Sequence, residues 1–137
     1  MVNTKHITGV FGEDRAVEFL RQTGYRILAR NWKSKHLELD IICSKGEELV
    51  FVEVKTRAAD ALQSAKEALS PAQQKNLLKA AQNYLTAHNA WDLPCRFDLI
   101  CVTCGDNNFH VEHIANAFEF NLAAGFVGSV HSAWQPW

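Results

Sequence analysis

The sequence lacks any long hydrophobic run and any excess of basic residues. No stretch reaches the roughly 18 consecutive apolar residues that a membrane-spanning helix needs, and residues 1–10 lack the basic start and apolar centre of a signal peptide. These absences exclude a chain with helical membrane spans and lead us to expect a cytoplasmic protein. With 14 Lys and Arg against 15 Asp and Glu, the net charge is -1. Any surface that neutralises nucleic-acid phosphates must therefore be local.

The chain has four cysteines, and a disulfide framework is not expected. Cys43 and Cys95 are interpreted as small buried apolar residues of a reducing compartment. A zinc site is an alternative, because its four ligands would have a plausible spacing: Cys101, Cys104, His110 and His113. The two cysteines lie an odd number of residues apart in a predicted strand, however, and should face opposite sides of the sheet.

Hydrophobic patterning predicts one α/β (α+β) domain, in which a mixed central sheet of about five strands is flanked by helices. The 137 residues, 47% of them hydrophobic, are enough for one core and too few for two. Ser70, Pro71 and Gln73 provide a cap, a first-turn proline and a capping-box partner for the second helix. The expected helices cover residues 12–23 and 70–88, and the expected strands cover residues 25–30, 36–43, 48–56, 96–103 and 109–114.

A charged pair interrupts the apolar strand at residues 49–55. Glu53 and Lys55 are two residues apart, so they project from the same face of the sheet. Burying either charge costs several kcal/mol, by order of magnitude, unless partners or a metal compensate. The pair is therefore either a functional site or a weak ion pair on a half-exposed edge strand.

A second acidic strand precedes this pair. In residues 36–43, Glu38 and Asp40 are expected to share one face while Leu39 and Ile41 share the other. Residues 44–47 form a turn of hairpin length, which predicts that the two strands are antiparallel neighbours. Asp40 should then approach Glu53.

An acid on one strand followed by Glu-x-Lys on the next resembles the restriction-endonuclease-like, or PD-(D/E)xK, nuclease superfamily. Within it, the sequence resembles the small bacterial YraN family, which is distantly similar to archaeal Holliday junction resolvases. The resemblance runs in order through Gly12-Glu13, Asn31-Trp32, residues 38–40, residues 51–57 and residues 96–98. Two positions depart from the pattern: Leu37 replaces an expected glycine, and an expected Phe-Gly is absent from residues 58–65.

The resemblance implies a restriction-endonuclease-like core at about residues 12–118, within a single nuclease-like domain of residues 1–137. It also implies Mg2+ or Mn2+ as cofactor. Asp40 and Glu53 would hold the metal, and Lys55 would orient the attacking water or neutralise the transition state. Glu13, from the first helix, would be a third catalytic and metal-binding carboxylate; read from the residues alone, it could equally be a helix-start acid. Glu38 is a weaker candidate.

Several polar side chains are candidates for nucleic-acid binding. Arg57 can donate two parallel hydrogen bonds to a phosphate, although an Arg at a strand end is common. Gln73 is also a candidate, with an ordinary helix surface as the alternative. A basic segment around Trp32 could track phosphates or could be a solvated charged face: Arg21, Arg26, Arg30, Lys33 and Lys35. Asp98 is interpreted as structural, paired with a basic group or backbone donors.

The expected function is metal-dependent hydrolysis of nucleic acid, with DNA, including branched DNA, as the favoured substrate. The competing hypothesis is a non-catalytic nucleic-acid-binding or assembly module that retains the nuclease fold, which the near-neutral charge favours. A homodimer would suit a two-fold symmetric junction. The aromatic-rich tail at residues 119–137 could pack over the domain or join a partner chain.

Overall fold

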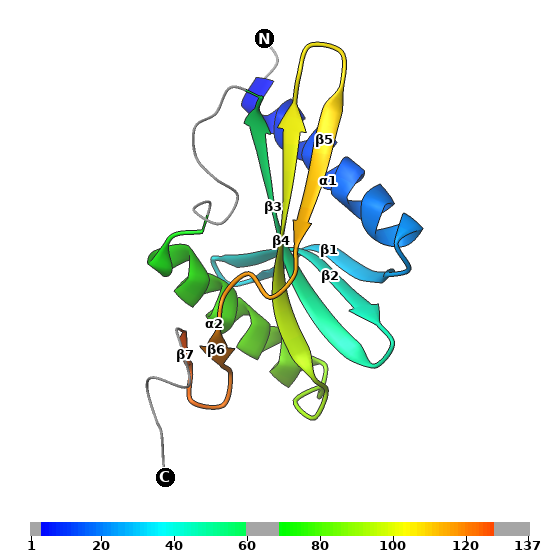
Figure 1. Cartoon of the computed structure of the whole chain (residues 1–137). Helices are drawn as coiled ribbons and strands as arrows, with labels where there is room; N and C mark the ends of the chain where they lie inside the picture. The colour runs from blue at the N-terminus through cyan, green and yellow to red at the C-terminus, as the bar shows by residue number, and fades with distance from the viewer. Residues whose placement is uncertain (1–3, 60–68, 128–137) are drawn as a thin grey trace.

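The fold is built around a five-stranded sheet in the order β1-β2-β3-β4-β5, with a helix on each face (Figure 1). This computed structural model describes residues 4–59 and 69–127. Its elements are α1 (Thr4–Gln22), β1 (Arg26–Ser34), β2 (Leu37–Lys45), β3 (Glu48–Ala58), α2 (Pro71–Ala87), β4 (Cys95–Cys104), β5 (Phe109–Ile114), β6 (Phe120–Asn121) and β7 (Phe126–Val127).

The sheet is mixed, as expected. β1, β2 and β3 pair antiparallel, β3 and β4 run parallel, and β5 returns antiparallel to β4. Parallel neighbours need a crossover connection, and α2 lies on the one that joins β3 to β4. The expected α/β class is confirmed, and the arrangement agrees with a nuclease-like core.

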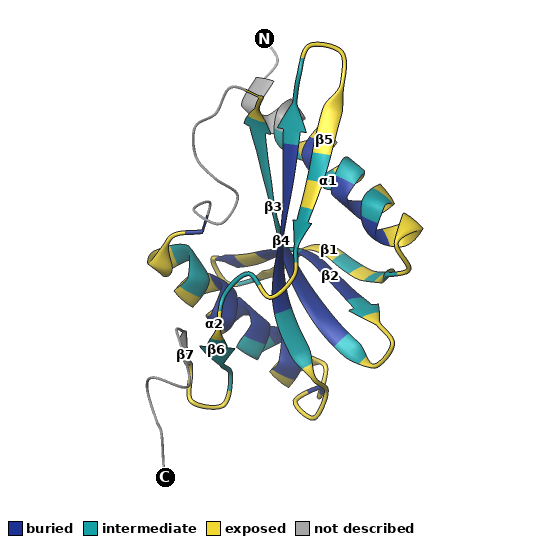
Figure 2. Cartoon of the chain, viewed as in Figure 1, coloured by how far each residue is buried: buried dark blue, intermediate teal, exposed yellow. Residues whose placement is uncertain are grey.

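Each face of the sheet has its own core layer. On the α2 face, Phe51 and Phe97 pack with Leu85 of the helix. On the α1 face, Val50 and Ile100 pack with helix residues such as Leu20. Alternate residues of β3 and β4 thus enter opposite layers, and Figure 2 shows buried residues along β4 and β2, whereas the edge strand β5 is exposed or half-buried.

The two helices differ in how well the sequence predicts them. Ser70 caps α2, and the expected capping box with Gln73 is present. The prediction that the first helix begins at residue 12 is wrong, because α1 begins at Thr4. Gly12 lies inside α1, where a Cβ atom would collide with the Thr56 side chain of β3. A helical glycine costs about 1 kcal/mol relative to alanine, and here it permits close helix–sheet approach.

Strand β1 is longer than predicted and ends at Ser34 rather than at residue 30. It is an edge strand whose burial alternates along most of its length. The hairpin between β2 and β3 is confirmed, with Lys45 opposite Glu48 beside the turn.

Asp98 lies 1% exposed on β4, inside a network of donors, as the sequence suggests. Its carboxylate accepts hydrogen bonds from Arg96 Nε at 2.9 Å and from the Asn116 amide at 3.1 Å, and it lies 2.7 Å from His113 Nε2. Burial alone would raise the pKa of Asp98, but the hydrogen bonds from His113, Arg96 and Asn116 lower it overall. Arg96 also pairs with Glu48 at 2.7 Å. Asp98 therefore has a structural role.

The start of the aromatic tail packs against the body of the protein. Phe120 and Leu122 contact the α2-face core, as does Phe118 just before the tail, and β6 and β7 form a short hairpin. Residues 128–137, which include Trp134 and Trp137, lie outside the described part of the chain. No described helix is long and apolar enough to cross a membrane.

Candidate active site

The candidate site lies where β2 and β3 separate. Their paired register ends at Ile41 opposite Val52, so Asp40 and Glu53 lie just past the last pair. Asp40 Oδ2 accepts a hydrogen bond from the Val54 amide at 2.9 Å. This side-chain contact satisfies a backbone donor at the point of separation.

Side-chain alternation along β2 breaks at Asp40. Leu39 packs in the α2-face core and Ile41 in the α1-face core, so the prediction that these two residues share a face is wrong. The opposite point of β1 is also irregular, because Asn31 has a positive φ of 51°. Asparagine tolerates this left-handed conformation better than most residues. The Asn31 side chain hydrogen bonds to Glu13, so the irregularity links β1 to the acidic residue of α1.

Glu53 and Lys55 form the pair that strand alternation predicts. Lys55 Nζ lies 3.5 Å from Glu53 Oε2, and the two side chains are 30% and 16% exposed, respectively. The pair is thus more enclosed than an ordinary surface ion pair. This burial makes the protonation state of Glu53 sensitive to its neighbours.

Burial and the nearby Asp40 carboxylate together raise the pKa of Glu53 to about 8, against the opposing effect of Lys55. Burial also raises the pKa of Glu13, with a further contribution from Asp40, while Asn31 and Arg30 act to lower it. Glu53 is therefore largely protonated at neutral pH, and crowding of acidic groups is one cause. A cation held by these acids would relieve that repulsion.

Replacing Glu53 with glutamine is expected to stabilise the protein selectively at high pH. The ordinary pKa is 4.5, so between about pH 4.5 and 8 the unfolded state loses a proton that the folded state retains. Wild-type stability should therefore fall as pH rises through this window. Glutamine does not titrate, and urea unfolding should show a relative gain of about 2–4 kcal/mol at about pH 9 compared with about pH 5. The exposed control Glu47→Gln should show no such gain, and an equal effect of Glu53→Gln at both pH values would contradict this prediction.

Three adjoining cavities converge on the acids. The central cavity, of about 640 Å³, is lined by Glu13, Asp40, Glu53, Lys55 and Arg57 among others. The hairpin cavity, of about 550 Å³, is lined by Gly9, Val10, Glu13, Arg30, Asn31, Lys33 and Glu38. The α2 cavity, of about 230 Å³, is lined by His36, Leu37, Glu38, Asp40, Glu53, Gln73, Asn76 and Leu77. The acids are thus bordered by two further cavities, one lined by α1 residues and one lined by α2 residues.

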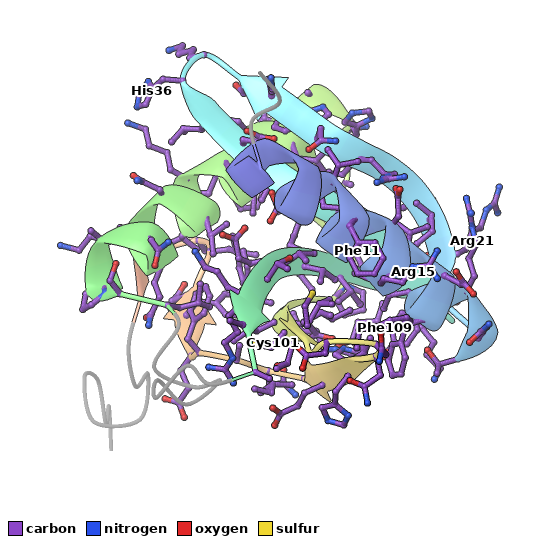
Figure 3. All side chains as sticks on the ribbon, turned by 90° about the horizontal axis from the view of Figure 1, so that it is seen from above. Phe11, Arg15, Arg21, His36, Cys101 and Phe109 are labelled. Carbon is purple, nitrogen blue, oxygen red and sulfur yellow. The ribbon has the colours of Figure 1, made fainter. Side chains whose placement is uncertain are left out.

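The structure brings some of the expected basic residues to these cavities and separates others. Arg57 lines the central cavity, and Arg30 and Lys33 line the hairpin cavity. Arg30 also pairs with Asp14 at 2.8 Å and with Glu13 at 3.7 Å, so much of its charge is balanced by α1. The other basic candidates are not among the cavity-lining residues: Arg21 lies in the last turn of α1, Arg26 at the start of β1 and Lys35 in the β1–β2 turn. Figure 3 shows Arg21 far from His36, which marks the β1–β2 turn.

Glu13 lies further from the helix start than the sequence suggests. The first turn of α1 contains no acid, so the helix N-terminus is not what favours Glu13 there. On α2, Gln73 lines the α2 cavity, but its Oε1 accepts the Ser70 amide at 3.0 Å as part of the capping box. Asn76 and His36 line the same cavity but are not predicted from the sequence, because single polar residues on a helix and in a turn carry no distinctive pattern.

The zinc alternative does not fit the sheet. Cys101 packs in the α2-face core, and Cys104 packs against the α1-face core. His113 lies opposite Ile100 and contacts Asp98. The odd spacing thus places the cysteines on opposite faces, as expected from strand geometry.

Comparison with known families supports the sequence resemblance. Residues 12–102 match the model described as "Uncharacterised protein family UPF0102". The chain belongs to the UPF0102 family. This is the YraN family of the sequence comparison, so that interpretation is confirmed.

Relatives in the UPF0102 family match all or most of the chain. A UPF0102 protein of Nitratidesulfovibrio vulgaris (strain DP4) is 48% identical over 137 residues, which is 100% of both chains. The UPF0102 protein LI0223 of Lawsonia intracellularis is 38% identical over 129 residues, or 94% of this chain and 96% of the relative. Among solved structures, SfsA of Pyrococcus furiosus in complex with Ca2+ aligns over 84% of this chain and 64% of its own, at 13% identity and a TM-score of 0.38. A similarity that remote carries no argument about function.

Proposed function

We propose that this protein is a Mg2+- or Mn2+-dependent hydrolase of nucleic-acid phosphodiester bonds, with DNA as substrate. The observation that carries the proposal is the enclosure of Asp40, Glu53 and Lys55 in one cavity at the split between β2 and β3. Carboxylate oxygens are ligands suited to Mg2+, and burial and the nearby Asp40 raise the pKa of Glu53 despite the opposing effect of Lys55, so a cation bound between these acids would be favoured.

The three acids of the central cavity fit such a cation in part. Asp40 and Glu53 would hold it, with Glu13 as a further ligand or as support for the attacking water. Among residues 4–59 and 69–127, no three Asp, Glu, His or Cys side chains form a ready metal-binding group. Mg2+ commonly binds through one or two carboxylates, with water and substrate oxygens completing its shell. Bound there, the cation would act as a Lewis acid on the phosphodiester and make water more acidic.

Lys55 supplies the positive charge next to the acids. Its ammonium group donates hydrogen bonds and can orient water or stabilise negative charge that develops on the phosphate. Lys55 Nζ lies 3.5 Å from Glu53 Oε2, so the ammonium group is next to the carboxylate that would hold the cation.

The neighbouring cavities would hold the rest of the strand. Arg57 lies along the central cavity, where its planar guanidinium suits a phosphate. Lys33 and Arg30 line the hairpin cavity, and Gln73 lines the α2 cavity. Lys35, in the β1–β2 turn two residues after Lys33, would contribute at longer range.

The test is cleavage of labelled single-stranded, duplex, flap and four-way-junction DNA, with matched RNA, in Mg2+ or Mn2+. Cuts that require the metal and disappear in Glu53→Gln would support the proposal and identify the substrate. Selective binding with no cleavage in either metal would instead support a non-catalytic binding or assembly module. The protein's oligomeric state, measured in the same samples, tests the expected homodimer.

A further inference from the structure

Two exposed phenylalanines and an arginine form a compact group on the surface. The rings of Phe11 on α1 and Phe109 on β5 have centroids 5.6 Å apart and are nearly perpendicular. The Arg15 guanidinium lies 5.5 Å from the centroid of each ring. Figure 3 shows the three side chains gathered between α1 and β5. We refer to Phe11, Arg15 and Phe109 as the aromatic platform.

The platform does not belong to the core. Phe11 is 39% exposed and Phe109 is 44% exposed, and neither belongs to the α1-face or α2-face core. Their neighbour Val10 is 46% exposed, which extends the apolar surface along α1. Exposed apolar groups of this kind mark interaction sites more often than scattered single residues do.

The platform adjoins one end of the central cavity. Phe109 lies directly opposite Cys104, so the two side chains point to the same face of the sheet, and Cys104 lines the cavity. Gly9, two residues before Phe11, lines it as well. Along β3, the cavity runs from Glu53 to Ala58, which pairs with Cys104. The five steps along the strand from Glu53 to Ala58 span about 17 Å, the length of a few nucleotides.

We propose that the aromatic platform stacks the unpaired bases of a nucleic-acid strand that leaves the active site through the central cavity. This inference rests on the proposed function and specifies its substrate class as nucleic acid with a single-stranded segment. Aromatic faces accept any base, at about 1–3 kcal/mol per stacked base. A guanidinium also offers a planar surface for stacking.

The charge of the platform favours unpaired bases over intact duplex as its ligand. The whole chain carries a net charge of -1, so phosphates must be neutralised by local basic groups, and Arg15 is the one basic residue of the platform. At the platform itself, Arg15 is paired with Glu18 at 3.1 Å, which offsets its charge. Binding at the platform must therefore come mainly from contact with ring faces, and paired bases inside a duplex do not expose theirs.

The experiment measures binding of a fluorescently labelled single-stranded oligonucleotide to the full chain in EDTA, where no metal-dependent cleavage occurs. Phe11→Ala and Phe109→Ala should each weaken binding by about 5- to 100-fold. Phe109→Trp, which keeps an aromatic face, should bind within about threefold of wild type, whereas Phe109→Leu should lose binding like the alanine variant. The control Leu28→Ala removes a side chain that is 43% exposed on β1 and should have no effect.

Three results would overturn the platform. They are wild-type binding by both alanine variants, retained binding by Phe109→Leu, and self-association of the wild type that these variants abolish without changing oligonucleotide binding. The last result would assign the surface to a second copy of the chain. The platform proposal and the nuclease proposal can fail separately. Cleavage that depends on Glu53, together with unaltered binding by the phenylalanine variants, would reject the platform proposal alone. Binding that depends on the two phenylalanines, without any cleavage, would reject the nuclease proposal alone.

Discussion

Asp40→Asn and Lys55→Ala are each expected to reduce metal-dependent cleavage by about a hundredfold to a thousandfold or more, without unfolding the protein. Asp40→Asn removes a negative charge from the cavity but retains an oxygen that can accept the Val54 amide. Lys55→Ala removes the ammonium group that lies beside Glu53. Asp40 lies just past the paired β2–β3 register, Lys55 lies three residues beyond its end, and neither belongs to the core, so folding should not depend on them.

Matched controls separate the loss of chemistry from a general change in charge. Asp92→Asn and Lys79→Ala remove the same charges from exposed positions. They should cleave at the wild-type rate, measured as initial rates on the substrate cut best by the wild type. Circular dichroism should confirm that all four variants are folded. If Asp40→Asn or Lys55→Ala cleaved like these controls, the assigned cavity would not contain the catalytic site.

Asp98→Ala is expected to lower the free energy of unfolding by about 3–5 kcal/mol, the usual cost of removing one member of a buried charged pair. The variant would leave Arg96 with Glu48 but without its most buried partner, and His113 and the Asn116 amide would also lose an acceptor. Urea unfolding near pH 7 measures the change. Since Asp98 has a lowered pKa, its contribution should be present above its ordinary pKa of 3.8 and be lost as pH falls through the folded-state value.

The exposed control Asp92→Asn should change stability by less than about 0.5 kcal/mol. Asp98→Asn should lie between the control and the alanine variant, because it preserves hydrogen bonding but not charge. A loss below about 1 kcal/mol in Asp98→Ala would show that the Arg96 and His113 contacts contribute little to folding. Since Asp98 does not line the cavities around Glu53, any loss of cleavage in this variant should follow the fraction unfolded.

Strand periodicity predicts the part of the fold that local geometry controls. It places Glu53 and Lys55 on one face, and the odd spacing of Cys101 and Cys104 places them on opposite faces. The signals at Ser70 likewise predict the start of α2 and its capping box. In each case the outcome depends on residues a few positions apart.

The errors arise where tertiary contacts override local patterns. Gly12 looks like a helix start, yet it lies inside α1 because β3 approaches the helix at Thr56. Alternation predicts Leu39 and Ile41 on one face, but the separation of β2 from β3 at Asp40 places them in different layers. The left-handed Asn31 opposite this point depends on the same long-range arrangement.

The sequence predicts which residues form the candidate site, but not how deeply they are buried or which side chains surround them. An acid followed by Glu-x-Lys identifies Asp40, Glu53 and Lys55, and the central cavity contains all three. The raised pKa of Glu53 depends on burial and on the distance to Asp40, neither of which one sequence provides. The positions of Asn76 and His36 in the α2 cavity likewise follow from packing of α2 beside the β1–β2 turn.

Titration calorimetry of the wild-type protein with Mn2+ tests the central claim most directly, because it needs no knowledge of the substrate. At about pH 7, in buffers with different ionisation enthalpies, the account predicts binding that releases about one proton, since the cation must displace the proton held by Glu53. Apparent affinity should rise toward about pH 8, and Glu53→Gln should lose both the binding and the proton release. Binding of Mn2+ that is unchanged in Glu53→Gln, or no binding by the wild type, would contradict the assignment of Asp40 and Glu53 as a metal centre.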